Sequence, residues 1–209
     1  MQKILVKRPL IRILIGLFLV PGLLGGGYFA YVMVVTTNFH TVVPGVVYRS
    51  AQPSPEDLRI WTRTYGLKTI INLRGKWKDE PFYIAEVATA KALGIGHIDI
   101  RFPGIRLPSG DSLRRFVAAL ENSPKPILLH CRMGADRAGF GSVMAAMALG
   151  GEPYKKALAQ MSMRYLHFDD NPTKIAGLLQ QYEAYCRSHS VGTGSWHEFR
   201  AWVMNVYHL

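Results

Sequence analysis

Residues 126–139 read PILLHCRMGADRAG, and this stretch decides how the rest of the chain is interpreted. Its first five residues form a short apolar run typical of a buried strand, and the residues after it form an apolar run typical of a helix. A loop between a strand end and a helix start points several backbone N–H groups inward, which makes a cradle for an anion. The stretch therefore predicts an anion-binding loop between a strand and a helix.

Two side chains of this loop have chemistry that suits a bound phosphate. Cys131 begins the loop in a positive field, which favours the nucleophilic thiolate. Arg137 ends the loop and can bind two phosphate oxygens at once. Gly134 permits a tight backbone turn, and Gly139 permits close packing of the helix. The pattern predicts a nucleophile and an electrostatic clamp around one tetrahedral anion, and the competing interpretation is an inert buried cysteine beside a surface arginine.

The sequence on either side of the loop alternates strand-like and helix-like segments. This alternation predicts an α/β fold with a central sheet that is covered by helices on both faces. Pro55, preceded by Ser54 and followed by two acidic residues, has the pattern of a helix start. The predicted strands are Gly45–Arg49, Lys68–Leu73, His97–Phe102 and Pro126–His130, and the predicted helices are Pro55–Gly66, Glu80–Leu93, Asp111–Glu121, Gly139–Leu149, Pro153–Met163, Thr173–Arg187 and Ser195–His208.

Three motifs together resemble one family. HCRMGADR, residues 130–137, resembles the phosphate-binding loop HCxxGxxR of the protein tyrosine and dual-specificity phosphatase superfamily. VYRSAQPS, residues 47–54, and GLKTIINLRG, residues 66–75, look like the compact, atypical dual-specificity branch found in bacteria, plants and fungi. The resemblance covers about residues 44–187.

The resemblance implies the cysteine-phosphatase fold and a phosphocysteine intermediate on Cys131, without a metal or a cofactor. Arg137 would bind phosphate and stabilise the transition state, and His130 would favour the thiolate. The phosphate would lie against Cys131, Arg132, Met133, Gly134, Ala135, Asp136 and Arg137.

The sequence departs from the family pattern directly after Arg137. Many members carry Ser or Thr there, whose hydroxyl helps the thiolate leave, whereas this chain has Ala138. Slow breakdown of the phosphoenzyme, or assistance from another group, is therefore expected.

The general acid has three candidates. Asp111 follows a loop suited to a mobile acid, Asp136 lies inside the motif, and Asp99 alternates within a predicted strand. Each also has a structural interpretation, as a helix-start residue, a loop-stabilising carboxylate and a strand carboxylate respectively. We take Asp111 as the first candidate and Asp136 as the second, for protonating the leaving oxygen and then activating water.

Charge favours anionic partners. The chain of 209 residues has 25 Lys and Arg against 14 Asp and Glu, a formal net charge of +11. Basic residues near the loop are candidates for shaping the substrate site, although solvated surface charge is the alternative. No module of interleaved basic and aromatic residues predicts nucleic-acid binding. The basic candidates are Arg74, Lys76, Lys78, Arg106 and Arg132.

Two cysteines, Cys131 and Cys186, do not make a disulfide framework, and no spacing suggests a structural metal.

The N-terminal region has the pattern of a membrane anchor. Residues 13–37 carry no charge, and such a run can cross a bilayer core of roughly 30 Å. Four basic residues precede it within residues 1–12, which predicts a cytoplasmic N-terminus and an extracytoplasmic domain over residues 38–209. In a Gram-negative bacterium this is a single-pass inner-membrane protein with a periplasmic domain. A signal peptide cleaved near Gly25–Gly27 and a buried soluble helix are the alternatives.

These observations favour a phosphatase that acts on a phosphoprotein, an inositide or a phospholipid. A catalytically weak phosphate-binding module is the alternative, because of Ala138. A thiol redox protein is a third hypothesis, although no resolving cysteine lies nearby in the sequence.

Overall fold

The computed structural model describes residues 8–168 and 170–209, and the chain divides into two compact units. The smaller unit ends at Thr36, and the larger unit runs from Thr37 to Leu209.

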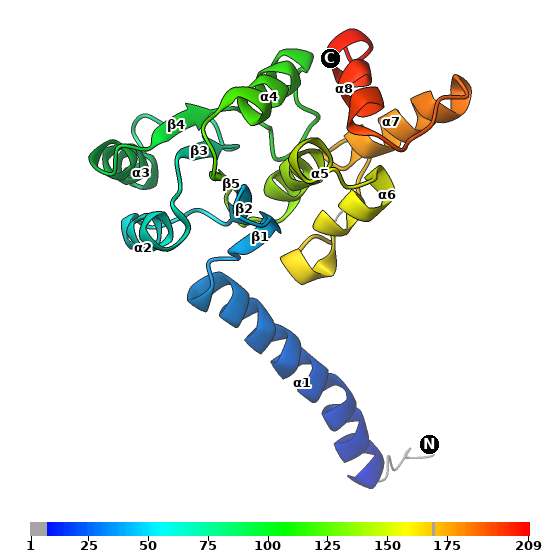
Figure 1. Ribbon diagram of the computed structural model, residues 1–209. Helices are drawn as coiled ribbons and strands as arrows, with labels where there is room; N and C mark the ends of the chain where they lie inside the picture. Colours follow the sequence, from blue (N-terminus) through cyan, green and yellow to red (C-terminus); the bar gives the residue numbers. More distant parts are fainter. Residues whose placement is uncertain (1–7, 169) are drawn as a thin grey trace. The chain divides into compact units, whose positions relative to one another are not determined.

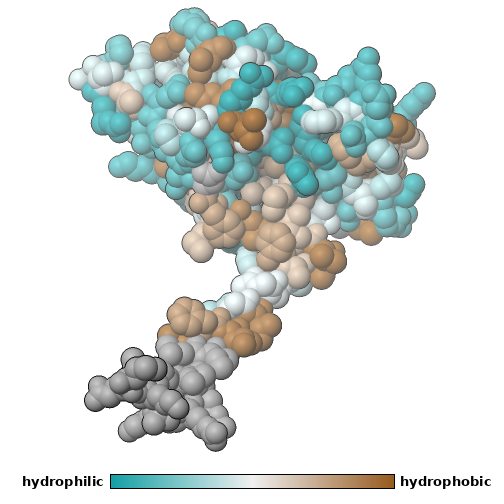
Figure 2. All heavy atoms as spheres, turned by 180° about the vertical axis from the view of Figure 1, so that it is seen from behind, coloured by the Kyte–Doolittle hydropathy of each residue, from teal (hydrophilic) through white to brown (hydrophobic). Residues whose placement is uncertain are grey.

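The smaller unit is helical. It consists of α1, Arg8–Ala30, and a π-helical segment, η1, Tyr31–Val35. Leu17–Val35 is apolar and long enough to cross a membrane, a property shared by membrane spans and signal sequences. Figure 2 shows hydrophobic residues on this unit, whereas the larger unit has a mostly hydrophilic surface. Lys3 and Lys7, two of the four basic residues on which the predicted membrane orientation depends, lie outside the described residues.

The larger unit is built on one mixed five-stranded sheet of order β1-β2-β5-β3-β4 (Figure 1). β1 is antiparallel to β2, and the other neighbours are parallel. Ser50 of β2 and Asn72 of β3 both pair with His130 of β5, so three strands end side by side where the Cys131 stretch begins. The strands are β1 His40–Val43, β2 Val47–Ser50, β3 Thr69–Asn72, β4 Gly96–Asp99 and β5 Ile127–His130.

Helices cover both faces of the sheet, as the alternation predicts (Figure 1). Adjacent strand residues face opposite cores: Ile70 and Leu128 pack with α2 and α3, whereas Ile71 and Leu129 pack in the larger core with α4, α5, α7 and α8. Burial of both faces explains why these strands are continuous apolar runs. The helices are α2 Pro55–Tyr65, α3 Pro81–Ala92, α4 Gly110–Asn122, α5 Asp136–Gly150, α6 Tyr154–Ala157, α7 Gly177–Ser188 and α8 Trp196–Asn205.

Two segments differ most from the sequence patterns. Residues 38–45 have the sequence pattern of a short linker before the domain, but they contain β1, which lies at the sheet edge beside β2. The single helix predicted over Pro153–Met163 is α6 followed by two 3-10 turns, η2 Leu158–Gln160 and η3 Met163–Tyr165. One reason is tertiary: the Gln160 carbonyl accepts a hydrogen bond from the Arg49 side chain, so it is not available to a continuing helix.

Candidate active site

Residues 131–135, hereafter the Cys131 loop, join β5 to α5. Gly134 has φ +72°, and a Cβ there would lie 2.7 Å from the Ala51 backbone nitrogen. Both the left-handed backbone and the close approach exclude larger residues. α5 begins at Asp136, three residues earlier than predicted, so Arg137 belongs to the first turn of the helix.

Arg49 supports the Cys131 loop from the sheet side. Its fully buried guanidinium donates to the carbonyls of Gly134 at 2.6 Å and Ala135 at 3.1 Å. It also donates to Gln160, and it lies 4.2 Å from the centre of the Tyr165 ring. Burial lowers the pKa of Arg49 to about 10, which still leaves the side chain charged at neutral pH. Sequence reasoning placed Arg49 only within a strand, and the signal for its role was an arginine in a buried apolar run.

Two further donors hold the first half of the Cys131 loop. The Gln52 backbone N–H donates to the Arg132 carbonyl at 3.3 Å, and the side chain of Asn38 donates to the Met133 carbonyl at 2.8 Å. Asn38 is buried, and its amide oxygen lies 3.1 Å from His40 Nε2. Asn38 therefore belongs to the site, although sequence reasoning assigned it to a linker.

The carbonyls of residues 132–135 are thus all bonded to donors outside the Cys131 loop. In a trans peptide the N–H of the next residue points the opposite way, so the N–H groups of residues 133–136 point away from these donors. Among the described residues, the N–H groups of Met133, Gly134 and Ala135 have no acceptor. N–H groups without an acceptor at the start of a long helix are suited to binding an anion. Cys131, which is buried, directly precedes this part of the loop.

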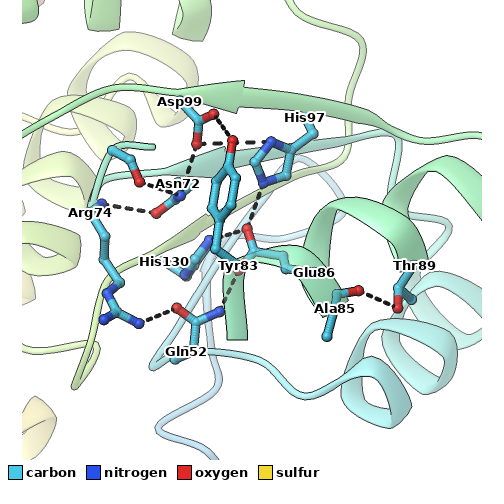
Figure 3. A network of polar contacts seen from close by, with 11 residues as sticks. Gln52, Asn72, Arg74, Tyr83, Ala85, Glu86, Thr89, His97, Asp99 and His130 are labelled. Atoms are coloured by element: carbon cyan, nitrogen blue, oxygen red, sulfur yellow. Dashed lines mark hydrogen bonds and ion pairs between the residues drawn. The ribbon is translucent and has the colours of Figure 1, made fainter. Parts of the chain in front are cut away.

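His130 is held by a buried carboxylate, Glu86 of α3 (Figure 3). Glu86 Oε1 lies 3.0 Å from His130 Nε2 and 2.6 Å from Nε2 of His97 on β4. Burial alone would disfavour the charge of Glu86, but the charge and hydrogen bonds of His130 and His97 outweigh it and hold the pKa of Glu86 well below its usual range. Glu86 therefore fixes the side chain directly before Cys131.

A second set of contacts ties the ends of β3 and β4 to this carboxylate network (Figure 3). Asp99 accepts from Asn72 Nδ2 at 2.9 Å and from the Tyr83 hydroxyl at 2.5 Å. Burial and the contact with Asp99 raise the pKa of Tyr83 above its usual value. Asp99 thus has the contacts of a structural carboxylate.

The far end of the motif borders a small pocket. Asp136 and Arg137 line a pocket of about 100 Å³ together with Pro103 and Gly104 of the β4–α4 loop. Asp136 Oδ1 lies 2.7 Å from Nδ1 of His167. The hydrogen bond with Asp136 raises the pKa of His167 above 6.5 against the opposing effect of burial. His167 had no signal in the sequence.

Of the three acid candidates, the structure brings one to this pocket. Asp136 lines it beside Arg137. Asp111 is exposed in the first turn of α4, where Ser109 caps the helix. Both carboxylate oxygens of Asp99 already accept hydrogen bonds, one from Asn72 and one from Tyr83.

Among the basic candidates outside the Cys131 loop, Arg74 is connected to the loop through Gln52. Its guanidinium donates to Gln52 Oε1 at 2.7 Å and stacks on the Phe82 ring at 3.6 Å. Arg132 is exposed on the loop itself, and Lys76 and Lys78 are exposed on the β3–α3 loop. Arg106 lines a pocket of about 620 Å³ beside the β4–α4 loop.

Ala138 and Cys186 both belong to the core. Ala138 is fully buried in the larger cluster, and its carbonyl accepts from the Ser142 hydroxyl at 2.6 Å. Cys186 on α7 is buried, and both cysteines are free thiols. In the described part of the chain, no three His, Cys, Asp or Glu side chains gather as a metal site would require.

Comparison with solved structures shows the same fold elsewhere. A DUF442 protein from Shewanella putrefaciens CN-32 is 19% identical, with a TM-score of 0.56 over 71% of this chain and 92% of that one. Tk-PTP in its active form is 18% identical, with a TM-score of 0.54 over 70% of this chain and 97% of that one. No curated protein sequence matches significantly.

A family model described as a DSP-PTPase phosphatase fused to NAD+ kinase matches residues 36–170, which contain both the Cys131 loop and most of the residues that support it. The match covers well over half of the chain. The chain therefore belongs to the DSP-PTPase phosphatase family, with a fold of the compact, atypical dual-specificity type.

Proposed function

We propose that this phosphatase hydrolyses phosphomonoesters through a cysteine nucleophile. The observation that carries the proposal is that the carbonyls of residues 132–135 are all bonded to donors outside the Cys131 loop, which leaves N–H groups of the loop without acceptors. Such N–H groups can bind the three non-bridging oxygens of a phosphate and favour a thiolate beside them. Arg137, in the first helical turn after the loop, is the proposed clamp on two of these oxygens.

The proposed reaction has two steps. The Cys131 thiolate forms a sulfur–phosphorus bond as the ester P–O bond breaks, and a carboxylic acid protonates the leaving oxygen. Water then attacks the phosphocysteine, the same carboxylate accepts its proton, and inorganic phosphate and the thiolate are released. Arg137 and the N–H groups stabilise the charge that develops on the phosphoryl oxygens in both steps.

For the general acid, the geometry favours Asp136 over the first sequence candidate, Asp111. Asp136 shares a pocket with Arg137, whereas Asp111 is exposed at the start of α4. His167, bonded to Asp136, would keep that carboxyl group oriented toward the pocket. Comparing Asp136→Asn with Asp111→Asn tests the assignment, because loss of the acid slows esters with poor leaving groups more than para-nitrophenyl phosphate.

The decisive experiment measures para-nitrophenyl phosphate hydrolysis by the full chain in detergent, with EDTA and a thiol reductant. We expect turnover that Cys131→Ser abolishes and that Arg137→Ala lowers by about a thousandfold, as for other groups that stabilise transition-state charge. Arg63→Ala, on the exposed face of α2, is a matched control for loss of one arginine. Turnover that persists in Cys131→Ser would refute the proposal.

Ala138 supports a second candidate function, a phosphate-binding module with feeble turnover. No hydroxyl stands directly after Arg137, and the alanine side chain is packed in the core. Rapid-quench kinetics separates the two functions: a burst of alcohol equal to the enzyme concentration, followed by a slow phase, indicates a phosphatase limited by phosphoenzyme breakdown. Tight phosphate binding without a burst would favour the binding module.

We further propose that the smaller unit is a single-pass anchor with residues 1–12 in the cytoplasm of a bacterial cell and residues 38–209 on the opposite side of the inner membrane. The apolar length of Leu17–Val35 and the basic residues before it support this topology. Protease accessibility in spheroplasts tests the orientation, and the mass of the mature protein distinguishes an anchor from a cleaved signal. Protection of the larger unit in intact spheroplasts would contradict it.

A further inference from the structure

Arg49 is a buried cation whose hydrogen-bond acceptors are all uncharged. Its guanidinium donates to the carbonyls of Gly134 and Ala135, to the Gln160 carbonyl and to Gln160 Oε1. The ion pairs of the described residues do not include Arg49, and within this part of the chain its Nε is buried without an acceptor. A buried charge is costly unless an opposite charge offsets it. An anion bound near this guanidinium would therefore stabilise it.

The packing around Arg49 holds its guanidinium in one position. The centre of the Tyr165 ring lies 4.2 Å away, and Gln160 accepts from Nη1 with both of its oxygens. Gly139 of α5 leaves room for this arrangement, because a Cβ there would lie 3.1 Å from the Gln160 carbonyl oxygen and 3.3 Å from Arg49 Nη2. The cation is therefore fixed against the Cys131 loop before any ligand binds.

Two peptide groups of the Cys131 loop connect Arg49 to the proposed anion site. In a trans peptide the N–H points away from the carbonyl, so the N–H groups of Ala135 and Asp136 point away from the carbonyls that accept from Arg49. Hydrogen bonds in a chain polarise one another, so a cation at the carbonyl oxygen makes the N–H of the same peptide a stronger donor. The charge of Arg49 thus reaches an anion on the other side of the loop without touching it.

We propose that Arg49 is a positioning residue whose charge, acting through these two peptide groups, strengthens anion binding by the Cys131 loop and favours the thiolate form of Cys131. The inference rests on the proposed cysteine-nucleophile function and adds a residue that does not contact the substrate. Arg137, in contrast, is the proposed direct contact to the phosphate oxygens. Preorganised dipoles of this kind stabilise developing charge because they need no rearrangement during the reaction.

Other charged groups near Arg49 and Cys131 remain the same in every comparison below. Burial and repulsion from Arg49 lower the pKa of His40 to about 4, so His40 is neutral at the pH values of interest. The remaining groups also stay in place, so a difference between variants reports the charge of Arg49. They are Tyr165 of η3, Asp136 and Arg137 of α5, His130 of β5, Arg132 of the loop and Arg74 after β3.

The substitution Gln160→Glu tests the charge while Arg49 stays in the protein. It keeps the size of the side chain and the acceptor that lies 3.1 Å from Arg49 Nη1, but it adds a negative charge that offsets the guanidinium. In the Cys131→Ser protein, titration calorimetry with inorganic phosphate should show about fivefold to tenfold weaker binding, with no loss of stability to denaturant. Gln181→Glu, on the exposed face of α7, adds the same charge elsewhere and should leave the affinity unchanged.

Comparing Arg49→Lys with Arg49→Gln separates charge from packing. Both lose the planar fork, but only lysine keeps the charge. In the full chain in detergent, the rate of Cys131 alkylation by iodoacetamide is followed against pH, with the labelled peptide identified by its mass. Arg49→Gln should move the midpoint of this profile upward by about one pH unit, and Arg49→Lys by less than half as much. Asn38→Ala, which removes a neutral donor to the Met133 carbonyl, should leave the midpoint in place.

These measurements need no ester hydrolysis, so they separate the inference from the proposed function. Phosphate binding and alkylation that depend on the charge of Arg49, in a protein without turnover, would support the inference and refute the proposed function alone. Normal turnover, with the affinity and the midpoint unchanged in folded Gln160→Glu and Arg49→Gln, would overturn the inference alone. Absence of phosphate binding in the Cys131→Ser protein would overturn both. Should Arg49→Gln not fold, Gln160→Glu decides by the same two measurements.

Discussion

Two carboxylate–histidine pairs flank the Cys131 loop, and they differ in nearly every physical respect. Glu86 and His130, at its start, are both buried, with the Glu86 side chain 1% exposed. Asp136 and His167, at its end, combine a buried imidazole with a carboxylate that is 48% exposed. In the first pair the pKa of the carboxyl group is lowered, and in the second the pKa of the imidazole is raised.

The two carboxylates differ in how firmly their surroundings hold them, and this difference distinguishes the two ends of the loop. A buried carboxylate with three partners cannot move without leaving buried polar groups unsatisfied, so Glu86 serves a fixed structural purpose. Asp136 is half-exposed and lies at the edge of a pocket, so it can contact solvent and any ligand there. The start of the loop is therefore fixed by buried contacts, whereas its end borders the pocket.

Removing the buried charge should have the largest effect. Glu86→Gln leaves His130 and His97 without their anionic partner, and we expect the free energy of unfolding to fall by about 3 kcal/mol. Turnover should fall by about a hundredfold because His130 directly precedes Cys131 and loses its fixed position. Denaturant unfolding and steady-state kinetics measure both quantities. Glu80→Gln, at the exposed start of α3, is the control, and an equal effect there would contradict the assigned role.

The second prediction concerns the pH dependence of stability, which should differ between the Glu86–His130 pair and the Asp136–His167 pair. The lowered pKa of Glu86 stabilises the fold above about pH 4.5, and this contribution is lost as pH falls through the lowered value. The raised pKa of His167 stabilises the fold below about pH 6.5, and this contribution is lost as pH rises through the raised value.

Unfolding of the wild type, Glu86→Gln and His167→Gln from about pH 2 to about pH 9 would reveal these opposite windows. The deficit of Glu86→Gln should persist at high pH and shrink in acid, whereas the deficit of His167→Gln should shrink in alkali. Parallel curves for the two variants would show that the pairs do not differ as inferred.

A smaller effect is expected from His167→Gln itself. The variant removes a 2.7 Å contact to Asp136. We therefore expect the free energy of unfolding at pH 6 to fall by about 1 kcal/mol. The kcat for esters with poor leaving groups should also fall, because Asp136 would lose the contact that orients it. An unchanged kcat together with the stability loss would assign His167 a purely structural role.

The smallest effect should come from Asp170→Asn. Asp170 contacts the other nitrogen of His167 at 3.3 Å, but it is 87% exposed and therefore screened by solvent. We expect a change in unfolding free energy within about 0.5 kcal/mol and no change in kcat. A loss as large as that of His167→Gln would mean that the outer carboxylate holds the imidazole in place.

Local patterns were sufficient for most of the fold. The β-branched run before Asn72 and the apolar run before Cys131 are buried on both faces, which leaves a clear sequence signal. Ser54 and Asp57 form the capping box that begins α2, because both partners of this contact lie within four residues. Edge strand β1 was missed because a four-residue strand with one neighbour has little apolar signal.

The sequence indicates the part of the candidate site whose residues are close together along the chain. Cys131, Gly134 and Arg137 lie within one loop and one helical turn, so their spacing alone is enough to predict the proposed anion-binding arrangement. The strand before the loop and the helix after it supply the N–H groups and the dipole, and these too are local properties.

Tertiary structure decided which side chains make that loop rigid and which carboxylate stands beside it. Arg49, Asn38 and Glu86 come from 44 to 95 residues away in sequence, and nothing in their own segments indicates their partners on the loop. These side chains become important when folding buries them, because a buried donor or acceptor must be hydrogen-bonded to a partner, which here lies on another segment. The sequence by itself thus determined the chemistry of the loop, whereas long-range burial determined the network around it.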